Sequence, residues 1–200
     1  MDTIWHTFWT YILFRKKKWL PWALVGSMLP DVIMMVILGY NFFAYGFSWE
    51  TYGAPPFLPG NLWNLSIFVH SLAVITPLAI IAFFIYRPLV ALFYGMGLHA
   101  LLDYATHHTE AYAPFYPLLL WKFVSPFSYW ETAYHSRLVM TINLILFAIA
   151  SIYLFKTMKV RWIEYGVFSF GVIYLAFLSW FYLSNNRIME LLMNGIIPFI

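Results

Sequence analysis

Five long apolar segments run through this chain and constrain its fold more than any other feature. They are Trp19–Phe47, Leu62–Tyr86, Leu89–His107, Leu138–Thr157 and Trp162–Leu183. A helix needs about 20 predominantly apolar residues to cross a bilayer, and in lipid a helix satisfies its backbone polar groups internally. The sequence therefore predicts an all-α fold, a polytopic membrane helix bundle with about five transmembrane helices, forming a single domain over residues 1–200.

The composition excludes an ordinary soluble domain. The 200 residues are 63% hydrophobic and 10% charged, whereas soluble domains average about 25% charged residues. The chain has no cysteine, which excludes disulfides and thiolate ligands. Residues 1–14 are too short to span and precede the basic run Arg15–Lys18, so they predict a short, half-buried N-terminal helix and not a signal peptide. Residues 184–200 fit an interfacial helix or a partner contact.

Basic residues indicate the orientation in the membrane. Arg15–Lys18, Arg87 and the group Lys156, Lys159 and Arg161 fall in alternate loops, and such loops are cytoplasmic by the positive-inside rule. The proline-containing loops 48–60 and 108–135 then face outward. We expect a multi-pass protein of the cell (inner) membrane whose partners are the bilayer and a lipid-like substrate, with no nucleic acid.

One polar run stands out inside the third apolar segment. His99, Asp103 and His107 are each four residues apart, so a helix places all three on one face. Imidazole and carboxylate are metal ligands, and ionisable side chains inside a membrane are costly unless they are paired or functional. The run predicts a metal site.

Other ionisable residues reach the same depth in the bilayer. With about 1.5 Å of rise per residue, Asp31 lies about 20 Å from Lys18, and Asp103 about 24 Å from Arg87. His70 and His6 lie about 13 and 14 Å from the ends of their own segments. In a core about 30 Å thick these values agree on the midplane to outer half. The predicted metal ligands are His6, Asp31, His70, His99 and Asp103.

Each residue alone has a simpler interpretation. His6 fits an interfacial histidine, Asp31 a helix cap after Pro30, and His70 an interhelical hydrogen bond. His99 and Asp103 fit a neutral hydrogen-bonded pair. Together the set favours one or two divalent cations, because an unpaired carboxylate in lipid is costly. The ligand types suit Zn²⁺, with Mn²⁺ or Fe as alternatives.

Such a site supports hydrolysis. Asp31, His70, His99 and Asp103 would complete four ligands, and Asp103 could bridge to a second ion held by His6. Two ions about 3.5–4 Å apart generate a hydroxide at neutral pH and stabilise charge on a phosphoryl oxygen. Six further residues are candidate outer metal or substrate contacts. They are His107, His108, Glu110, Lys122, His135 and Arg137.

Five ordered motifs resemble a known family. They are Trp5-His6, Gly26-Ser-Met-Leu-Pro-Asp31, Val69-His-Ser71, His99-Ala-Leu-Leu-Asp103, and Pro117-Leu-Leu119 followed by Ser125-Pro-Phe-Ser128. The order resembles the YdjM-like inner-membrane metal-dependent hydrolases, LexA-regulated in one member, over residues 5–130. It is more distantly similar to zinc-dependent phospholipase C and the single-strand nucleases. The resemblance implies phosphoester hydrolysis with Asp31 or a bridging hydroxide as base or nucleophile, and we expect Asp31 and Asp103 to be the catalytic residues.

The chain departs from that family at two places. Val32-Ile33 follows Asp31 where the family has a second Asp, and Asn64-Leu-Ser66 occupies the region of its His-Arg-Gly. The leading hypothesis is a membrane-embedded hydrolase that acts on a lipid or lipid-linked (phospho)ester from the outer half of the bilayer. The departures favour an alternative, a non-catalytic accessory protein stabilised by its metal. A further alternative is a zinc amide hydrolase similar to ceramidases, which also use three histidines and an Asp.

Overall fold

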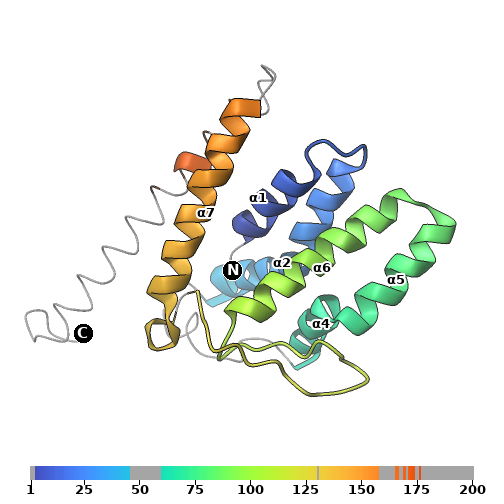
Figure 1. Ribbon diagram of the computed structural model, residues 1–200. Coiled ribbons are helices and arrows are strands. Elements are labelled where there is room, and N and C mark those ends of the chain that lie inside the picture. The colour runs from blue at the N-terminus through green and yellow to red at the C-terminus, as the bar shows by residue number, and fades with distance from the viewer. Residues whose placement is uncertain are drawn as a thin grey trace, which may run out of the picture. The chain divides into compact units, whose positions relative to one another are not determined.

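The computed structural model describes residues 3–45, 60–129 and 131–157 and scattered positions between 165 and 176. Every regular element in this described part is a helix, as the sequence predicted (Figure 1). The helices are α1 (Thr3–Phe14), α2 (Leu20–Tyr45), α4 (Gly60–His70), α5 (Leu72–Ile85), α6 (Pro88–Thr106), the 3₁₀ turn η1 (Thr132–Tyr134) and α7 (Ser136–Thr157). The chain divides into two compact units, residues 1–141 and 142–200, with the boundary inside α7.

Fewer helices meet the requirements of a membrane span than the sequence predicted. In the described residues α6 and α7 are long and apolar enough to cross a bilayer, and α4 with α5 adds a third if this bent pair is one span. Leu20–Ile33 of α2 forms a shorter apolar helix. Most of the fifth apolar segment, 162–183, and the whole tail 184–200 lie outside the described residues. The described part therefore gives two to three candidate spans, not five.

The second apolar segment is not one straight helix. Its two halves, α4 and α5, meet at Ser71 with a bend of 53°. The Ser71 hydroxyl donates to the carbonyl oxygens of Tyr116 (2.6 Å) and Pro114 (3.1 Å), and the Ala73 N–H also donates to Pro114 O (3.2 Å). These bonds join the break to the loop after α6, which the sequence pattern does not reveal.

The first apolar segment, unlike the second, forms a single helix. We expected a kink or break near Pro30; the helix is not broken there, because α2 continues through Pro30 to Tyr45. Proline removes one backbone hydrogen bond from a helix interior. Here α2 packs against α1 and α6, and Pro30 is fully buried. Tertiary packing therefore stabilises the helix where that backbone hydrogen bond is lost.

Helices α2 and α6 cross in backbone contact. A Cβ atom on Gly26 would lie 1.9 Å from Leu92 O, and one on Gly95 would lie 2.2 Å from Ala23 O. Only glycine permits such an approach, which is a common way for helices to associate in membranes. The crossing brings the middle of α2 onto the face of α6 that carries His99.

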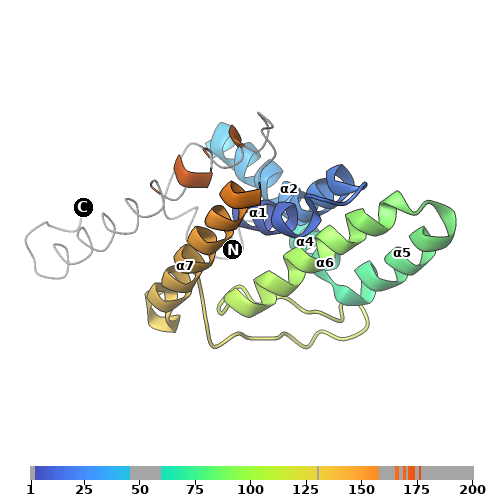
Figure 2. The same cartoon turned by 45° about the horizontal axis from the view of Figure 1, so that its top comes forward.

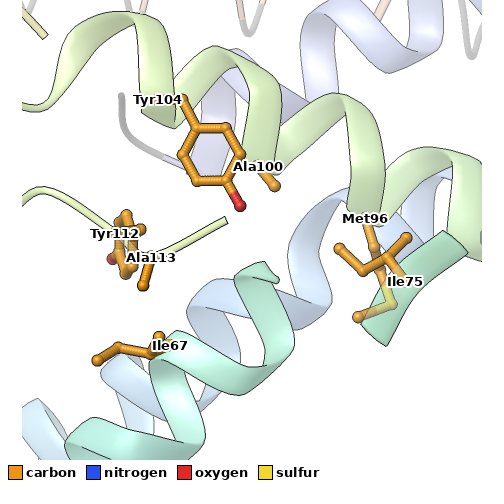
Figure 3. Close-up of a cluster of buried hydrophobic side chains, with 7 residues drawn as sticks. All are labelled: Ile67, Ile75, Met96, Ala100, Tyr104, Tyr112 and Ala113. Carbon is orange, nitrogen blue, oxygen red and sulfur yellow. The ribbon is translucent and has the colours of Figure 1, made fainter. Parts of the chain in front are cut away.

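A buried apolar cluster lies beside this crossing, where α4, α5, α6 and the following loop meet (Figure 3). Its members are Ile67, Ile75, Met96, Ala100, Tyr104, Tyr112 and Ala113. The loop between α6 and α7 contributes Tyr112 and Ala113, so it forms part of the core. In both views this loop lies at the end of the first unit opposite the α1–α2 and α5–α6 turns (Figures 1 and 2).

Candidate metal centre

Helix α6 supplies two residues of the site from successive turns. His99 and Asp103 are both fully buried, and His99 Nε2 lies 3.1 Å from Asp103 Oδ2. The other ring nitrogen, His99 Nδ1, lies 2.7 Å from the carbonyl oxygen of Ser27 across the glycine crossing. A carbonyl only accepts, so Nδ1 carries the proton and, in the neutral ring, Nε2 presents its lone pair to Asp103.

His70 reaches the same point from the end of α4. It lies 17 residues before Arg87, and Asp103 lies 16 residues after it. Helices α5 and α6 pack on each other, so residues equally far from the turn at Arg87 lie at one level. The Tyr104 hydroxyl donates to the carbonyl oxygen of His70, which fixes this register.

The His70 ring is held in the same way as that of His99. Its Nδ1 lies 2.7 Å from the carbonyl oxygen of Ser66, and its face stacks on Tyr112 with ring centroids 4.1 Å apart. By the same argument, Nε2 of a neutral His70 points a lone pair at Asp103 Oδ2, 3.3 Å away. Nδ1 bonds of this kind orient metal-binding histidines in many proteins.

Asp31 completes the group from α2. Its Oδ2 accepts a hydrogen bond of 2.6 Å from the Thr3 hydroxyl of α1, and its Oδ1 lies 3.4 Å from His99 Nε2. The Asp31 side chain is 19% exposed, whereas those of His99 and Asp103 are 0–2% exposed. Asp31 is therefore the least buried of these three side chains.

These four residues could hold a metal ion. One ligand atom from each of Asp31, His70, His99 and Asp103 lies within 4.8 Å of the others. Three of the six separations between these ligand atoms are 3.1–3.4 Å, close to the edge of a tetrahedron whose metal–ligand bonds are about 2.0–2.1 Å. His70 Nε2 and His99 Nε2 are buried and make no hydrogen bond of ordinary geometry. Lone pairs that face each other at this distance repel unless a cation or a proton lies between them.

His6 faces the other carboxylate oxygen of Asp103. Its Nε2 is 3.0 Å from Asp103 Oδ1, whereas His70 and His99 face Oδ2, and its ring stacks on His99 with centroids 3.8 Å apart. Oδ1 of this carboxylate thus faces His6 and Oδ2 faces His70 and His99, as the two oxygens of a bridging ligand would. In the described residues no third side chain joins His6 and Asp103 in a second metal-binding group, so the second ion stays a prediction.

His107 ends α6 and is buried beside the group, but its geometry differs. Its Nδ1 lies 3.0 Å from the Asp103 carbonyl oxygen and 3.4 Å from Oδ1. Its ring lies against Tyr112 and Tyr129. With Nδ1 committed to a carbonyl of its own helix, His107 is a neighbour of the group and not one of its four members.

The remaining outer candidates do not converge on the centre. His108 bonds the carbonyl oxygen of Ser125 through Nδ1 and stacks on Tyr134. His135 is exposed and lies near Phe127. The last three candidates lie in the loop after α6 or at the start of α7. Lys122 and Arg137 are exposed, and Glu110 is half-buried.

A further contact in this loop has no signal in the sequence. Thr109 donates from its hydroxyl and its N–H to the Glu131 carboxylate. Burial acts to raise the pKa of Glu131, but these bonds outweigh it and lower the pKa. Burial raises the pKa of Glu110, and the nearby Glu131 charge adds to this effect.

Sequence reasoning missed the residues that hold the ligands. Ser27 lies one helical turn before Asp31, a spacing that could have suggested its role on the same face. Ser66 likewise lies one turn before His70 in α4, whereas the parts played by Thr3 and Tyr112 depend on contacts between elements and have no such signal. Comparison with protein-family models, curated proteins and solved structures finds no match for this chain.

Proposed function

We propose that this protein is a membrane-embedded, metal-dependent hydrolase of a lipid or lipid-linked ester, most simply a phosphoester, and that it works in the outer half of the bilayer. One observation carries the proposal. Two buried histidines, each anchored through Nδ1 on a backbone carbonyl, direct their Nε2 atoms at Asp103. That arrangement supports a cation at their centre.

The charges of the group favour a divalent ion. Asp31 and Asp103 bring two negative charges into a largely buried site, and neutral histidines do not compensate them. A divalent cation balances both carboxylates and removes the cost of burying them. Nitrogen and oxygen ligands without sulfur suit Zn²⁺, and Mn²⁺ and Fe remain alternatives.

The chain's own residues support hydrolysis at the side of the group that Asp31 occupies. When bound, a divalent cation lowers the pKa of water and stabilises negative charge on a phosphoryl oxygen. Asp31 is the part-exposed member, so water and substrate approach there. His70, His99 and Asp103 would hold the ion, and we assign Asp31 as the base that takes the proton of the attacking water and returns it to the ester oxygen, which leaves as an alcohol. Thr3 holds Oδ2 of Asp31 and directs Oδ1 to the reaction.

The depth of the group supports a lipid substrate. Asp103 lies 16 residues from Arg87, which is about 24 Å along a helix. In a core about 30 Å thick, the group then lies about 6 Å below the surface opposite Arg87. The basic turn residues 15–18 and 87 indicate the cytoplasmic side, so the group lies in the outer half of the bilayer, a short distance beneath the outer-leaflet ester bonds.

Metal content of matched variants tests the site. His99→Ala removes a ring whose Nδ1 bonds a carbonyl and whose Nε2 faces Asp103. His108→Ala removes a ring with the same kind of Nδ1 bond but outside the group. We expect purified wild-type protein and His108→Ala to bind about one equivalent of zinc and His99→Ala to bind far less. Equal zinc content in all three would refute the site.

Activity tests the reaction separately. We expect release of phosphate or headgroup from phospholipids in mixed micelles, loss of that release on chelation, and its recovery with added zinc. Asp31→Asn should abolish turnover, because the amide cannot accept the proton from water. The Asp31→Asn protein should still bind more zinc than His99→Ala does. Tight zinc binding without turnover of phospholipid or amide lipids would favour the non-catalytic accessory protein, for which the burial of His70, His99 and Asp103 is the supporting observation.

A further inference from the structure

An irregular loop between α6 and α7 exposes an unusual run of large apolar side chains. We call residues 115–127 the apolar loop; within it Leu118 and Leu120 are 77% and 76% exposed. Eight large hydrophobic side chains are exposed within thirteen residues. They are Phe115, Leu118, Leu119, Leu120, Trp121, Phe123, Val124 and Phe127. On a lipid-facing helix this exposure would be ordinary, but this segment has no helical ladder to satisfy its backbone.

Hydrogen bonds attach the backbone of the apolar loop to the core. The N–H of Phe123 donates to Tyr112 O (3.2 Å), and the N–H of Ser125 donates to His107 O (3.3 Å). Near its start, Tyr116 O accepts from the Ser71 hydroxyl at the α4–α5 break. The backbone is thus tied to the core at several points while the apolar side chains project outward.

The level of the apolar loop coincides with a membrane surface. Helix α6 has 19 residues, or about 28 Å of rise, which is close to the hydrocarbon thickness of about 30 Å. Arg87 precedes α6 at one end, and the segment that includes the apolar loop follows at the other. The loop lies at the end of the unit opposite the basic α1–α2 turn in both views (Figures 1 and 2).

We propose that the apolar loop inserts its side chains into the headgroup–acyl boundary of the outer leaflet, so that a lipid surface is its partner. Lipid-exposed irregular backbone does not enter the hydrocarbon core, which limits insertion to this boundary. Trp121 beside the exposed Lys122 fits the boundary, where an indole anchors and a lysine stem extends its amine to the headgroups. A patch this apolar marks an interaction surface, and the adjoining candidate span α6 makes lipid the occupant.

Docking of this loop would fix the height of the metal centre. Tyr112 at its base stacks on His70, and Ser71 beside His70 holds Tyr116 O. A loop seated at the headgroup level therefore keeps His70 a short distance beneath it. The inference rests on the membrane placement proposed above but not on hydrolysis.

The absence of cysteine allows single-cysteine labelling without any background change. Leu120→Cys, Ile80→Cys and Ala133→Cys are each labelled with an environment-sensitive fluorophore, and the full chain is reconstituted in phosphatidylcholine–phosphatidylglycerol vesicles. Ile80 is an exposed residue of α5 and Ala133 an exposed residue of η1. Lipids that carry a nitroxide near the headgroup or near the acyl-chain end then quench according to depth.

We expect blue-shifted emission at Leu120 with stronger quenching by the shallow nitroxide, deeper quenching at Ile80, and water-like emission at Ala133. If Leu120 behaves like Ala133 while Ile80 is quenched, the loop does not dock on lipid although the membrane placement holds. If Ile80 is not quenched either, the placement itself fails. Strong self-quenching between Leu120 fluorophores of two copies, without quenching by the lipid nitroxides, would assign the surface to a second copy and overturn the inference.

Discussion

The glycine crossing between α2 and α6 gives the sharpest test of how the centre is built. A Cβ atom on Gly95 would lie 2.2 Å from Ala23 O and 2.9 Å from Ser27 N. These are backbone atoms of α2, which cannot move aside as a side chain can. Gly95→Ala must therefore separate the two helices or rotate one of them. His99 follows one turn later on the same face of α6.

The size of the effect follows from the geometry. Ordinary contact begins at 3.4 Å, so Ala23 O must retreat by about 1 Å. The bond from His99 Nδ1 to Ser27 O, now 2.7 Å, would stretch beyond the range of a hydrogen bond. Loss of such a support costs about 10–100-fold in metal affinity. Helix propensity acts in the opposite direction, because alanine stabilises a helix interior by about 0.5–1 kcal/mol relative to glycine.

Gly97→Ala is the matched control on the same helix. Its added Cβ would meet only Ile75 Cγ2, at 3.8 Å, which is ordinary contact. We expect it to bind zinc like the wild type and to be equally or slightly more stable. Zinc affinity is measured in detergent by competition with a chromophoric chelator, and helix content and thermal unfolding are followed by circular dichroism.

Two results would refute this reasoning. Wild-type zinc affinity in Gly95→Ala would mean that the crossing does not position His99. An equal loss of affinity in Gly95→Ala and Gly97→Ala would mean that affinity follows helix composition and not the close approach. Gly26→Ala, with its Cβ 1.9 Å from Leu92 O, should repeat the Gly95→Ala result from the other helix.

Three further predictions concern the supports around the centre. Tyr104→Phe removes the hydroxyl on His70 O and should lower the free energy of unfolding by about 1 kcal/mol, with a modest loss of zinc affinity by the same competition assay. Ser71→Ala removes the bonds to Pro114 O and Tyr116 O and should speed proteolysis of the 108–131 loop; an unchanged cleavage rate would contradict this tie. The lowered pKa of Glu131 contributes stability that is complete above its ordinary value of 4.5 and is lost as the pH falls through the lowered pKa. Amide hydrogen exchange of the loop should therefore rise, after correction for intrinsic rates, below about pH 4.5, and Thr109→Val should remove most of that pH dependence.

Local spacing determined part of the site from the sequence. His99 and Asp103, four residues apart on an apolar helix, had to share a face, and they lie on one face of α6. Distances along each helix also placed Asp31 and His70 at a matching depth, and the structure brings these four residues together. The helical fold was equally predictable, because apolar segments in lipid must satisfy their own backbone.

Other features could not be predicted from sequence patterns, because they depend on contacts between elements. Hydropathy cannot distinguish a straight span from α4 and α5, which are bent at Ser71 by bonds to a loop about 45 residues away. The proline rule allowed a break at Pro30, and packing keeps α2 unbroken there. Five spans were predicted, and the described residues give two to three.

The sequence by itself determined that this chain is helical and apolar, and that His and Asp residues recur at one depth. Only the tertiary structure decided how they function as a group. It set His70 and His99 against one oxygen of Asp103 and His6 against the other. It also supplied the carbonyl of Ser27 on α2 that orients His99 on α6. Residue spacing fixes which side chains share a helix face and which carbonyl lies one turn back, as for Ser66 and His70, whereas the lone pair of His99 is directed by a backbone atom that a distant segment brings into contact.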